Sequence, residues 1–188
     1  MRIIAGKLRG RRLLAPKDDA IRPTSDRARE ALFNILEHGA PPVRGASFLD
    51  LFCGTGAVGL EAHSRGAAEV LLIESDRAAL KLAEANIVRL GSPPGIRLLA
   101  RDATLLGPAP HPFDLVFLDP PYGSGLAAAA LKALATNGWL AADTRVIVEL
   151  ATRDELELPP AYALERERRY GRASFLFLRP RDQAGRWQ

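Results

Sequence analysis

The sequence predicts an α/β fold in which helices cover both faces of a doubly wound, mostly parallel β-sheet. Two observations support this prediction. Short apolar runs of strand length alternate with longer segments of helical periodicity, and glycine-rich or polar turns separate them. The expected strands lie at 46–52, 69–74, 95–100, 113–118 and 144–150, and the expected helices at 57–65, 76–90 and 124–136.

The start of the chain carries smaller elements. Gly6 and Gly10 bracket a turn in the first twelve residues, which predicts a small basic β-hairpin. A helix should follow, because Pro23-Thr24-Ser25 offers an N-cap before an apolar stripe at helical spacing. The stripe consists of Ala28, Ala31, Leu32, Ile35 and Leu36.

At the other end of the chain, residues 161–170 and 173–178 flank Gly171 and predict an antiparallel hairpin that closes the sheet. A linker with two prolines, from Gly39 to Gly45, separates the N-terminal elements from the first core strand. We therefore divide the chain into an N-terminal extension, residues 1–44, and a larger domain, residues 45–188.

Composition limits the class of protein. A chain of 188 residues with 47% hydrophobic residues suits one globular domain with small additions. No apolar stretch has membrane-spanning length and no signal-peptide pattern opens the chain, so we expect a cytoplasmic protein. Cys53 is the single cysteine, and the three histidines stand apart in the sequence. We therefore expect no disulfide and no metal site, and a monomer.

The net charge of +4 is unevenly distributed. Lys and Arg outnumber Asp and Glu by ten to five in residues 1–44 and by seven to three in 164–188. Acids prevail by fourteen to nine in residues 45–163. Basic ends around an acidic body indicate a polyanionic partner, although basic tails can also serve only solubility. The first twelve residues favour the partner, since they contain five basic residues and no acid: Arg2, Lys7, Arg9, Arg11 and Arg12.

A glycine-rich turn follows the first core strand. Gly54, Gly56 and Gly59 match the dinucleotide-binding pattern GxGxxG, and Glu74 ends the next strand at the expected distance. Taken literally, the pattern predicts an oxidoreductase that uses a nicotinamide cofactor. Asp50 argues against it, because a carboxylate here would repel a pyrophosphate. It favours a cationic ligand with a ribose and an adenine, such as S-adenosylmethionine.

Acids end three successive strands. Asp50, Glu74 and Asp102 are placed to bind, in that order, the methionine end, the ribose and the adenine of such a ligand. Each acid alone is more often a solvated loop residue or a helix cap. Three acids at the ends of three successive strands are much less often a coincidence, which favours a shared binding site.

The tetrapeptide Asp119-Pro120-Pro121-Tyr122 follows the apolar run Leu115–Leu118, at the end of a strand where open α/β sheets bind ligands. The two prolines lack backbone N–H groups, so the segment presents carbonyl and carboxylate acceptors beside an aromatic face. This combination suits a planar ring that carries an NH2 group. A surface turn after a strand is the alternative.

These motifs together resemble the amino-group branch of class I S-adenosylmethionine-dependent methyltransferases. The N-terminal sequence narrows the resemblance to the RsmD family, through Arg2–Gly6, Leu8–Arg11, Arg22-Pro23-Thr24 and Asp26–Glu30 with Leu32-Phe33-Asn34. That family methylates the N2 amine of a guanine in bacterial 16S ribosomal RNA. The resemblance covers Met1 to about Leu150 and implies a Rossmann-like methyltransferase sheet. It also implies 16S rRNA or the small ribosomal subunit as partner.

The resemblance assigns roles to individual residues. The catalytic residues would be Asp119, Pro120, Pro121 and Tyr122. The residues that bind S-adenosylmethionine, and its product S-adenosylhomocysteine, would be Asp50, Phe52, Cys53, Gly54, Thr55, Gly56, Glu74, Ser75, Asp102, Ala103 and Asp119. The residues that bind RNA would be Arg2, Lys7, Arg9, Arg11, Arg12, Arg22, Thr24, Arg27 and Arg29.

Two other functions stay open. A DNA amino-methyltransferase shares the Asp-Pro-Pro-Tyr motif, but this short chain offers no obvious separate DNA-recognition domain. A nicotinamide oxidoreductase or an inactive nucleotide-binding module would share the glycine pattern, but not Asp50 or Asp119–Tyr122. Titration with S-adenosylhomocysteine and with NAD would distinguish this last class from the methyltransferases.

Overall fold

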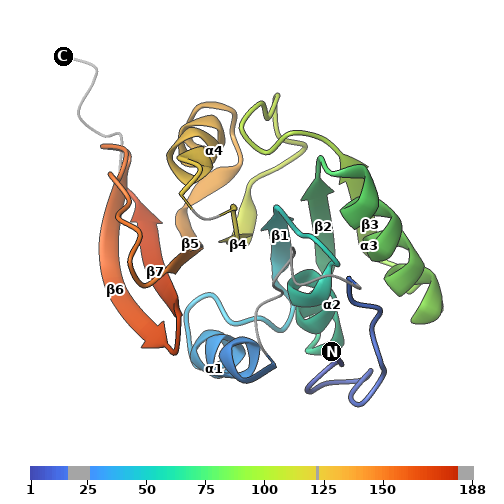
Figure 1. Ribbon diagram of the computed structural model, residues 1–188. Coiled ribbons are helices and arrows are strands. Elements are labelled where there is room, and N and C mark those ends of the chain that lie inside the picture. The colour runs from blue at the N-terminus through green and yellow to red at the C-terminus, as the bar shows by residue number, and fades with distance from the viewer. Residues whose placement is uncertain (17–25, 122, 182–188) are drawn as a thin grey trace.

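The computed structural model describes residues 1–16, 26–121 and 123–181 (Figure 1). In chain order the elements are α1 (Asp26–Glu37), β1 (Ser47–Leu51), α2 (Ala57–Ser64), β2 (Glu69–Glu74), α3 (Arg77–Arg89), β3 (Ile96–Ala100), β4 (Phe113–Leu118), α4 (Leu126–Thr136), β5 (Leu140–Ala151), β6 (Tyr162–Tyr170) and β7 (Ala173–Pro180). No helix among these has both the length and the apolar composition needed to cross a bilayer.

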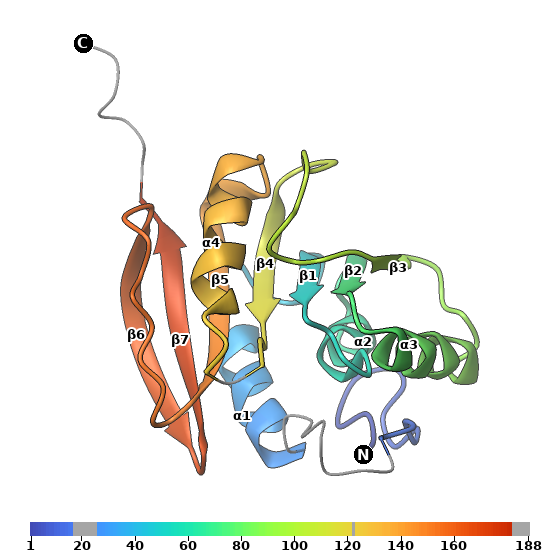
Figure 2. The same cartoon turned by 45° about the horizontal axis from the view of Figure 1, so that its top comes forward.

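The strands form one seven-stranded sheet in the order β3-β2-β1-β4-β5-β7-β6. β1 to β5 pair in parallel, whereas β7 runs antiparallel to both β5 and β6. The strand order reverses between β1 and β4, and both strands point toward the same edge of the sheet (Figure 2). Open α/β sheets bind ligands at such a switch point, beyond the carboxyl ends of the strands.

Helices cover the two faces unequally, which completes the predicted doubly wound architecture. α1, α2 and α3 pack on one face, where Phe33, Phe48 and Phe117 belong to one buried cluster. α4 packs on the other face with Trp139 and Tyr162 in a second cluster. Most inward-facing residues of the central strands are fully buried, as parallel strands between two helical layers require.

The predicted elements are confirmed with small shifts in their ends. β5 begins at Leu140 instead of 144, because the β4–β5 register shifts between Phe113 and Leu115 and lets Leu140 pair with Phe113. The closing hairpin of β6 and β7 is also confirmed, with Gly171 in the left-handed region at its turn. The N-cap predicted at Pro23-Thr24-Ser25 lies outside the described residues.

The N-terminal segment, residues 1–14, reverses direction as predicted, but its ladder is limited to one antiparallel bridge between Arg2 and Arg12. Three backbone hydrogen bonds close the turn, from Ile3 N–H to the Arg11 carbonyl (2.9 Å), from Gly10 N–H to the Ile3 carbonyl (2.9 Å) and from Leu13 N–H to the Met1 carbonyl (3.2 Å). Other amides of the segment bind α2. The buried Glu61 carboxylate of α2 accepts hydrogen bonds from the N–H groups of Ile4 (2.8 Å) and Ala5 (3.0 Å). Ser64 accepts another from Leu8 N–H at 2.9 Å. The segment is therefore a short hairpin that is also fastened to α2.

Gly59 sets how closely α2 approaches the sheet. A Cβ atom at this position would lie 2.3 Å from Leu72 Cδ2 and 2.9 Å from Val70 Cγ1, and both neighbours are fully buried. This is the third glycine of the pattern, the one that allows close contact between helix and strand.

We predict that Gly59→Ala destabilises the protein. Helix propensity alone would favour alanine by about 1 kcal/mol. Overpacking against Leu72 and Val70 should outweigh that gain and leave a net loss of roughly 1–3 kcal/mol. Chemical denaturation measures the effect, with Gly107→Ala as control, because the nearest atom to a Cβ there is Arg101 Nη1 at 3.8 Å. A Gly59→Ala protein as stable as the wild type would contradict the tight packing.

Candidate active site

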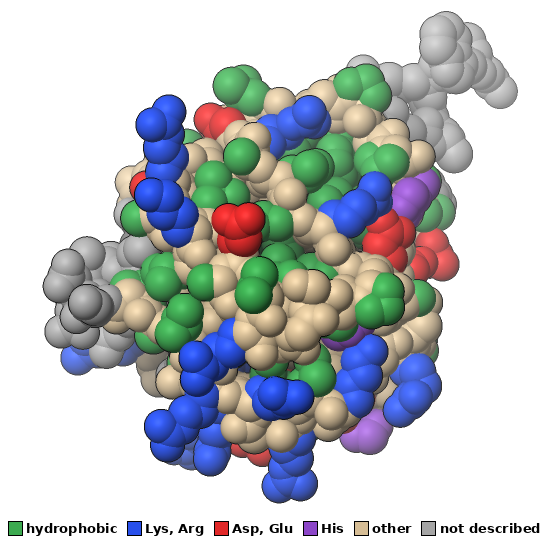
Figure 3. All heavy atoms as spheres, turned by 90° about the vertical axis from the view of Figure 1, so that its right-hand side faces the viewer, with side chains coloured by type: hydrophobic (Ala, Val, Ile, Leu, Met, Phe, Trp, Pro, Cys, Tyr) green, Lys and Arg blue, Asp and Glu red, His purple; other side chains and the backbone are tan. Residues whose placement is uncertain are grey.

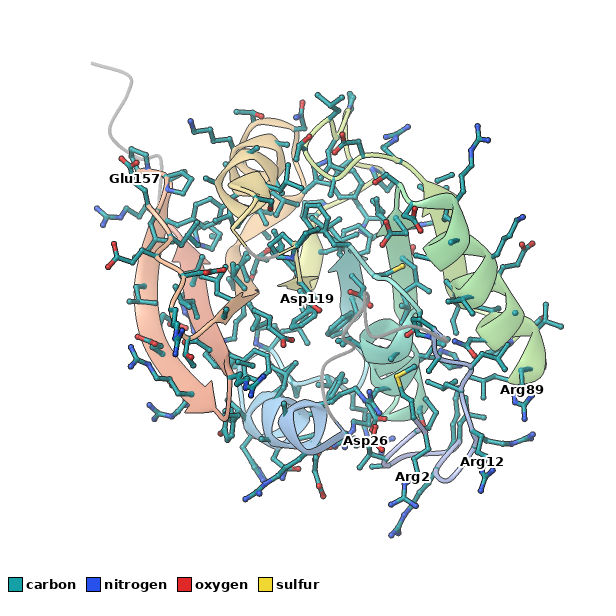
Figure 4. All side chains as sticks on the ribbon, in the orientation of Figure 1. Arg2, Arg12, Asp26, Arg89, Asp119 and Glu157 are labelled. Atoms are coloured by element: carbon teal, nitrogen blue, oxygen red, sulfur yellow. The ribbon has the colours of Figure 1, made fainter. Side chains whose placement is uncertain are left out.

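Three acids from adjacent strands meet at the switch point. Leu51 pairs with Leu118 and Leu118 with Val148, so that Asp119, just after β4, follows side by side with Glu149, near the end of β5. Asp50 pairs with Phe117, two residues before Asp119, and therefore lies on the same face of the sheet as Asp119. Figure 4 shows Asp119 in the middle of the molecule, beside the end of β4.

The glycine loop turns sharply between β1 and α2. Phe52 has a φ of 57°, a left-handed conformation that costs energy for a bulky residue and indicates that its surroundings hold it there. Gly54 and Gly56 follow with φ values of 54° and 77°, which glycine adopts without strain. A Cβ on Gly54 would meet no atom within 4 Å, so its outer side faces open space.

Three amides of the glycine pattern already have acceptors within the protein. Gly54 N–H donates to Glu74 Oε2 at 2.9 Å, and Gly56 N–H to the Cys53 carbonyl at 2.7 Å. Gly59 N–H donates to Asp50 Oδ2 at 2.8 Å. A pyrophosphate would need such amides free. The loop is thus occupied by carboxylates where a dinucleotide-binding loop would offer donors.

Glu74 lies at the end of β2 and connects the loop to the neighbouring strand. Besides Gly54 N–H, its carboxylate accepts hydrogen bonds from the N–H groups of Ser75 (2.8 Å) and Asp76 (2.9 Å) through Oε1. Three amides therefore fix the position of the carboxylate, and Glu74 as a whole residue is only 8% exposed. Such a held carboxylate is a preorganised acceptor for hydroxyl groups.

Asp50 is almost fully buried and takes the place of an N-cap side chain for α2, whose N-cap residue is Gly56. Burial raises the pKa of Asp50 to about 7, the Gly59 hydrogen bond opposes the rise, and the nearby Glu74 and Glu149 add to it. Near neutral pH this group therefore shares its population between acid and carboxylate.

Asp119 has a half-buried side chain at the mouth of the switch point. Burial raises its pKa well above the ordinary value, and the Glu149 and Asp50 carboxylates raise it further. No donor within the described part of the chain contacts its carboxylate. Its backbone N–H binds the Leu51 carbonyl at 3.3 Å, which ties the loop to β1.

The loop after Asp119 is held by two hydrogen bonds. The Ser124 hydroxyl donates to the Pro121 carbonyl at 2.5 Å, and Gly123 N–H donates to Asp154 Oδ2 at 3.1 Å. Pro120 is buried and Pro121 exposed. Tyr122 lies outside the described residues, so its predicted stacking role stays a prediction.

The remaining predicted cofactor residues occupy different environments. Asp102 is exposed, and its Oδ1 accepts from the N–H and hydroxyl of Thr104, which leaves Oδ2 for a ligand. Ala103 is buried in the core, so only its backbone could reach a ligand. Cys53 and Thr55 are buried within the glycine loop, and Ser75 is exposed beside Glu74. Burial raises the pKa of the Cys53 thiol, which keeps it protonated and unreactive.

Two residues near the site were absent from the sequence prediction. Glu149 follows the apolar run Val146–Val148 just as Asp119 follows its own run, so the strand-end pattern already contained the signal. Asn86 of α3 is buried and donates to the Thr55 carbonyl at 3.0 Å, while its Oδ1 accepts from Leu14 N–H at 2.6 Å. It connects α3, the glycine loop and the N-terminal segment.

Most of the predicted RNA-binding residues are exposed. Arg2, Lys7, Arg9, Arg11, Arg12 and Arg27 all reach solvent. Figure 4 shows Arg2 and Arg12 pointing away from the body of the molecule. Figure 3, which faces the right-hand side of the view in Figure 1, shows Lys and Arg side chains gathered over the lower part of that side. Arg89 of α3 donates from Nε to the Arg12 carbonyl at 3.0 Å and extends this surface. Arg22 and Thr24 lie outside the described residues.

Arg29 is a correction. It was expected to bind RNA, but its side chain is fully buried under the N-terminal segment. Nη2 donates to the Arg2 carbonyl (2.6 Å) and to Asp26 (2.9 Å), and Nε lies 3.9 Å from Glu61. It faces inward because it shares the helix face of Leu32, Phe33 and Leu36. Arg29 therefore fastens the basic segment to α1 and α2, and does not contact a partner itself.

The site's chemistry matches a cation better than an anion. Its ionisable groups are the acids Asp50, Glu74, Asp119 and Glu149. Burial and the neighbouring acids disfavour the ionised forms of Asp50 and Asp119, and a nearby positive charge would favour them. Among the described residues, no group of three or more His, Cys, Asp or Glu side chains is arranged to hold a metal ion. The arrangement can hold a cationic ligand and present Asp119 beside it.

The sequence of this chain is similar to those of several known proteins. The family model described as Conserved hypothetical protein 95 matches residues 1–179. The Ribosomal RNA small subunit methyltransferase D of Escherichia coli K12 is 39% identical over 176 residues, which cover 93% of this chain and 87% of the relative. The protein of the same name from Haemophilus influenzae is 35% identical over 93% of this chain and 91% of its own length.

Solved structures agree. A putative methyltransferase from Escherichia coli, yhhF, superposes with a TM-score of 0.82 at 38% identity and covers 97% of this chain and 99% of that one. A putative methylase from Haemophilus influenzae gives 0.76 at 33% identity, with coverage of 95% and 97%. A magnesium protoporphyrin IX methyltransferase from Synechocystis, solved with bound S-adenosylmethionine, gives 0.63 at 17% identity and shows the shared fold alone.

We predict that Asp50→Asn changes how stability depends on pH. The folded-state pKa of Asp50, about 7, lies above the usual unfolded value of about 3.9. The folded state therefore keeps the extra proton between these values, and the free energy of unfolding should fall as pH rises through them. Asparagine cannot titrate but can still accept the Gly59 N–H through its amide oxygen.

The variant should thus gain stability relative to the wild type between pH 5 and 8, by at most about 1.4 kcal/mol per pH unit. Urea denaturation at four pH values measures the difference. Asp143→Asn, which removes an exposed charge far from the site, controls for net charge. If the free energies of unfolding of the wild type and of Asp50→Asn depend on pH in the same way over this range, Asp50 is ionised throughout it and the prediction is wrong.

Proposed function

The chain belongs to the family described as Conserved hypothetical protein 95, the RsmD family of the sequence resemblance, and from this premise we propose its reaction. It is an rRNA methyltransferase that transfers a methyl group from S-adenosylmethionine to the N2 amine of a guanine in 16S rRNA. The observation that carries the proposal is the position of Asp119-Pro120-Pro121 abreast of the glycine loop, at the switch point of the sheet.

The residues present fit S-adenosylmethionine. Glu74 is held to accept the ribose hydroxyls, Asp102 keeps one oxygen for the adenine amine, and Gly54 leaves open space in front of the loop. The acidic edge suits the positive charges of the methionine end. When bound, S-adenosylmethionine supplies an electrophilic methyl group. The N–H groups of Gly54 and Gly59 already bind carboxylates and are not free for a pyrophosphate, which disfavours NAD as the ligand.

Asp119 and Pro120 prepare the amine for reaction. The lone pair of guanine N2 is conjugated with the ring, so the nitrogen is a weak nucleophile until it becomes pyramidal. The Asp119 carboxylate and the Pro120 carbonyl accept its two N–H groups and favour that geometry. As N2 gains the methyl group it loses one proton, and the raised pKa of Asp119 makes this carboxylate a better acceptor for it. Tyr122 stacks on the base and fixes its plane.

The target base must leave its stack to reach this site, so an RNA loop or a flipped base is the substrate. The exposed basic residues of the N-terminal segment bind its phosphates. Glu61, Ser64 and Arg29 hold this segment rigidly against α2, whose N-terminus forms part of the site. Phosphate contacts along the segment therefore position the RNA relative to Asp119.

Mapping of rRNA methylation by mass spectrometry tests the function. Cells without the gene should lack one N2-methylguanosine in 16S rRNA, and the purified protein with S-adenosylmethionine should restore it on small subunits or rRNA from those cells. Unchanged rRNA together with a lost DNA methyl mark would favour the DNA amino-methyltransferase instead.

We predict that Asp119→Ala separates chemistry from binding. Turnover should fall by on the order of a hundredfold or more, as loss of a positioned transition-state partner does. Affinity for S-adenosylhomocysteine, measured by calorimetry, should stay close to that of the wild type. Asp143→Ala removes the same charge at an exposed position and should leave both unchanged. Full turnover of the Asp119→Ala protein would remove this residue from the mechanism.

We predict that Arg11→Glu weakens RNA binding without affecting the cofactor. Each lost phosphate contact should reduce the slope of log affinity against log salt by roughly 0.7 to 0.9. Lys132→Glu is the matched control, because it makes the same charge change on α4, on the opposite face of the sheet. Equal salt slopes for the wild type and both variants would favour a basic segment that serves only solubility.

A further inference from the structure

The β6–β7 hairpin carries a second basic surface at the active-site edge. β-sheet register places Asp119, Glu149, Phe175 and Arg168 in one row across β4, β5, β7 and β6. Three strand spacings of about 4.8 Å separate the ends of this row, roughly 14 Å in all. The hairpin turn at Gly171 therefore lies just beyond the edge from which Asp119 projects.

One face of this hairpin combines an aromatic ring with arginines. Arg166, Arg168 and Tyr170 alternate along β6 and share the face of Phe175 and Phe177. We call these three residues, with Arg172 of the turn, the β6 arm. Tyr170 is half-buried, and its ring lies 5.9 Å from that of Phe175. Phe175 in turn lies 6.5 Å from Phe117, two residues before Asp119.

The arginines of the β6 arm are only partly engaged within the protein: the Arg166 guanidinium lies 5.3 Å from the centre of the Phe177 ring, and Arg168 Nη1 donates to the Glu167 carbonyl at 3.0 Å. Arg168 and Arg172 are exposed, and none of Arg166, Arg168 and Arg172 forms an ion pair with a described residue. The nearby acids are engaged elsewhere: Glu167 bonds Arg169 and Ser174, and Glu165 pairs with Arg145 and Arg179. A surface with three cations and one aromatic ring, and without an acid of its own, fits a polyanion with planar bases.

The β6 arm and the N-terminal segment lie on the two sides of α1. Figure 1 and Figure 2 both show the β6–β7 turn beside α1 on the side away from the N-terminal segment. RNA that contacts both surfaces would span α1, which lies beside the carboxyl edge of the sheet that carries Asp119. The two basic ends of the chain thus flank the acidic site in space as they do in sequence.

We propose that the β6 arm binds a nucleotide that flanks the target guanine, with Tyr170 stacked on its base and the arginines on neighbouring phosphates. This inference rests on the proposed RNA methyltransferase function. It assigns to the last two strands a part in substrate binding that is independent of the N-terminal segment. Stacking requires a ring but not the hydroxyl of Tyr170, and this difference makes the proposal testable.

The test compares Tyr170→Ala, Tyr170→Phe and Arg172→Glu with the wild type, and uses Lys132→Glu as the charge-matched control. Affinity for a single-stranded oligoribonucleotide, for protein-free 16S rRNA and for assembled small subunits is measured by fluorescence anisotropy at several salt concentrations. Tyr170→Ala should weaken binding roughly five- to a hundredfold, whereas Tyr170→Phe should bind as the wild type does. Arg172→Glu should lower the salt slope, and Lys132→Glu should not.

Calorimetry with S-adenosylhomocysteine checks that each variant keeps its fold and its cofactor site. Wild-type RNA affinity in a folded Tyr170→Ala protein would overturn the proposal, as would equal losses in Tyr170→Ala and Tyr170→Phe. A loss seen only with assembled small subunits, and not with protein-free RNA, would point to a ribosomal protein as the partner and would also overturn it. If the wild-type enzyme methylates no rRNA, the proposed methyltransferase function is wrong. If it methylates rRNA but the Tyr170 variants behave as stated above, only the role of the β6 arm is wrong.

Discussion

Two hydrogen bonds from backbone amides to carboxylates hold the site in shape: Gly59 N–H donates to Asp50, and Gly54 N–H donates to Glu74. The first replaces an N-cap and fixes the start of α2, and the second fastens the loop to the end of β2. Both place negative charge where burial makes it unfavourable. The same contacts that build the loop therefore also disfavour a pyrophosphate and favour a cationic ligand. The shape of the loop and its choice of ligand both follow from these two carboxylates.

The rest of the molecule is arranged around the helix that starts at this loop. Gly59 lets α2 lie close on β2, and Glu61 on the same helix binds the N-terminal segment through two backbone amides. Asn86 adds a link between α3, the loop and Leu14. Because these links run through buried polar groups, the basic segment has a fixed position relative to Asp119. The β6 arm is fixed equally well, since β5 and β7 share a continuous ladder.

Much of this could be predicted from the sequence, because apolar runs and glycine turns are local signals. The strands and helices from α1 to β7 appear within a few residues of their expected ends. What failed depended on tertiary contacts. Arg29 belongs to a basic stretch in sequence, yet its helical phase places it on the buried face with Leu32 and Phe33. The attachment of the N-terminal hairpin to α2 through the Glu61 carboxylate could not be predicted either, because it joins residues that are far apart in the sequence.

Proton release on ligand binding tests most directly the claim that the acidic edge exists to bind a cation. S-adenosylmethionine is titrated by calorimetry into the protein at pH 6.5, below the usual α-amino pKa of about 7.7–8.0, in buffers that differ in ionisation enthalpy. With the pKa of Asp50 near 7 in the free protein, binding should shift that group toward its carboxylate form and release a measurable fraction of a proton. Asp50→Asn should reduce the release. Binding without proton release, or with proton uptake, would contradict the account.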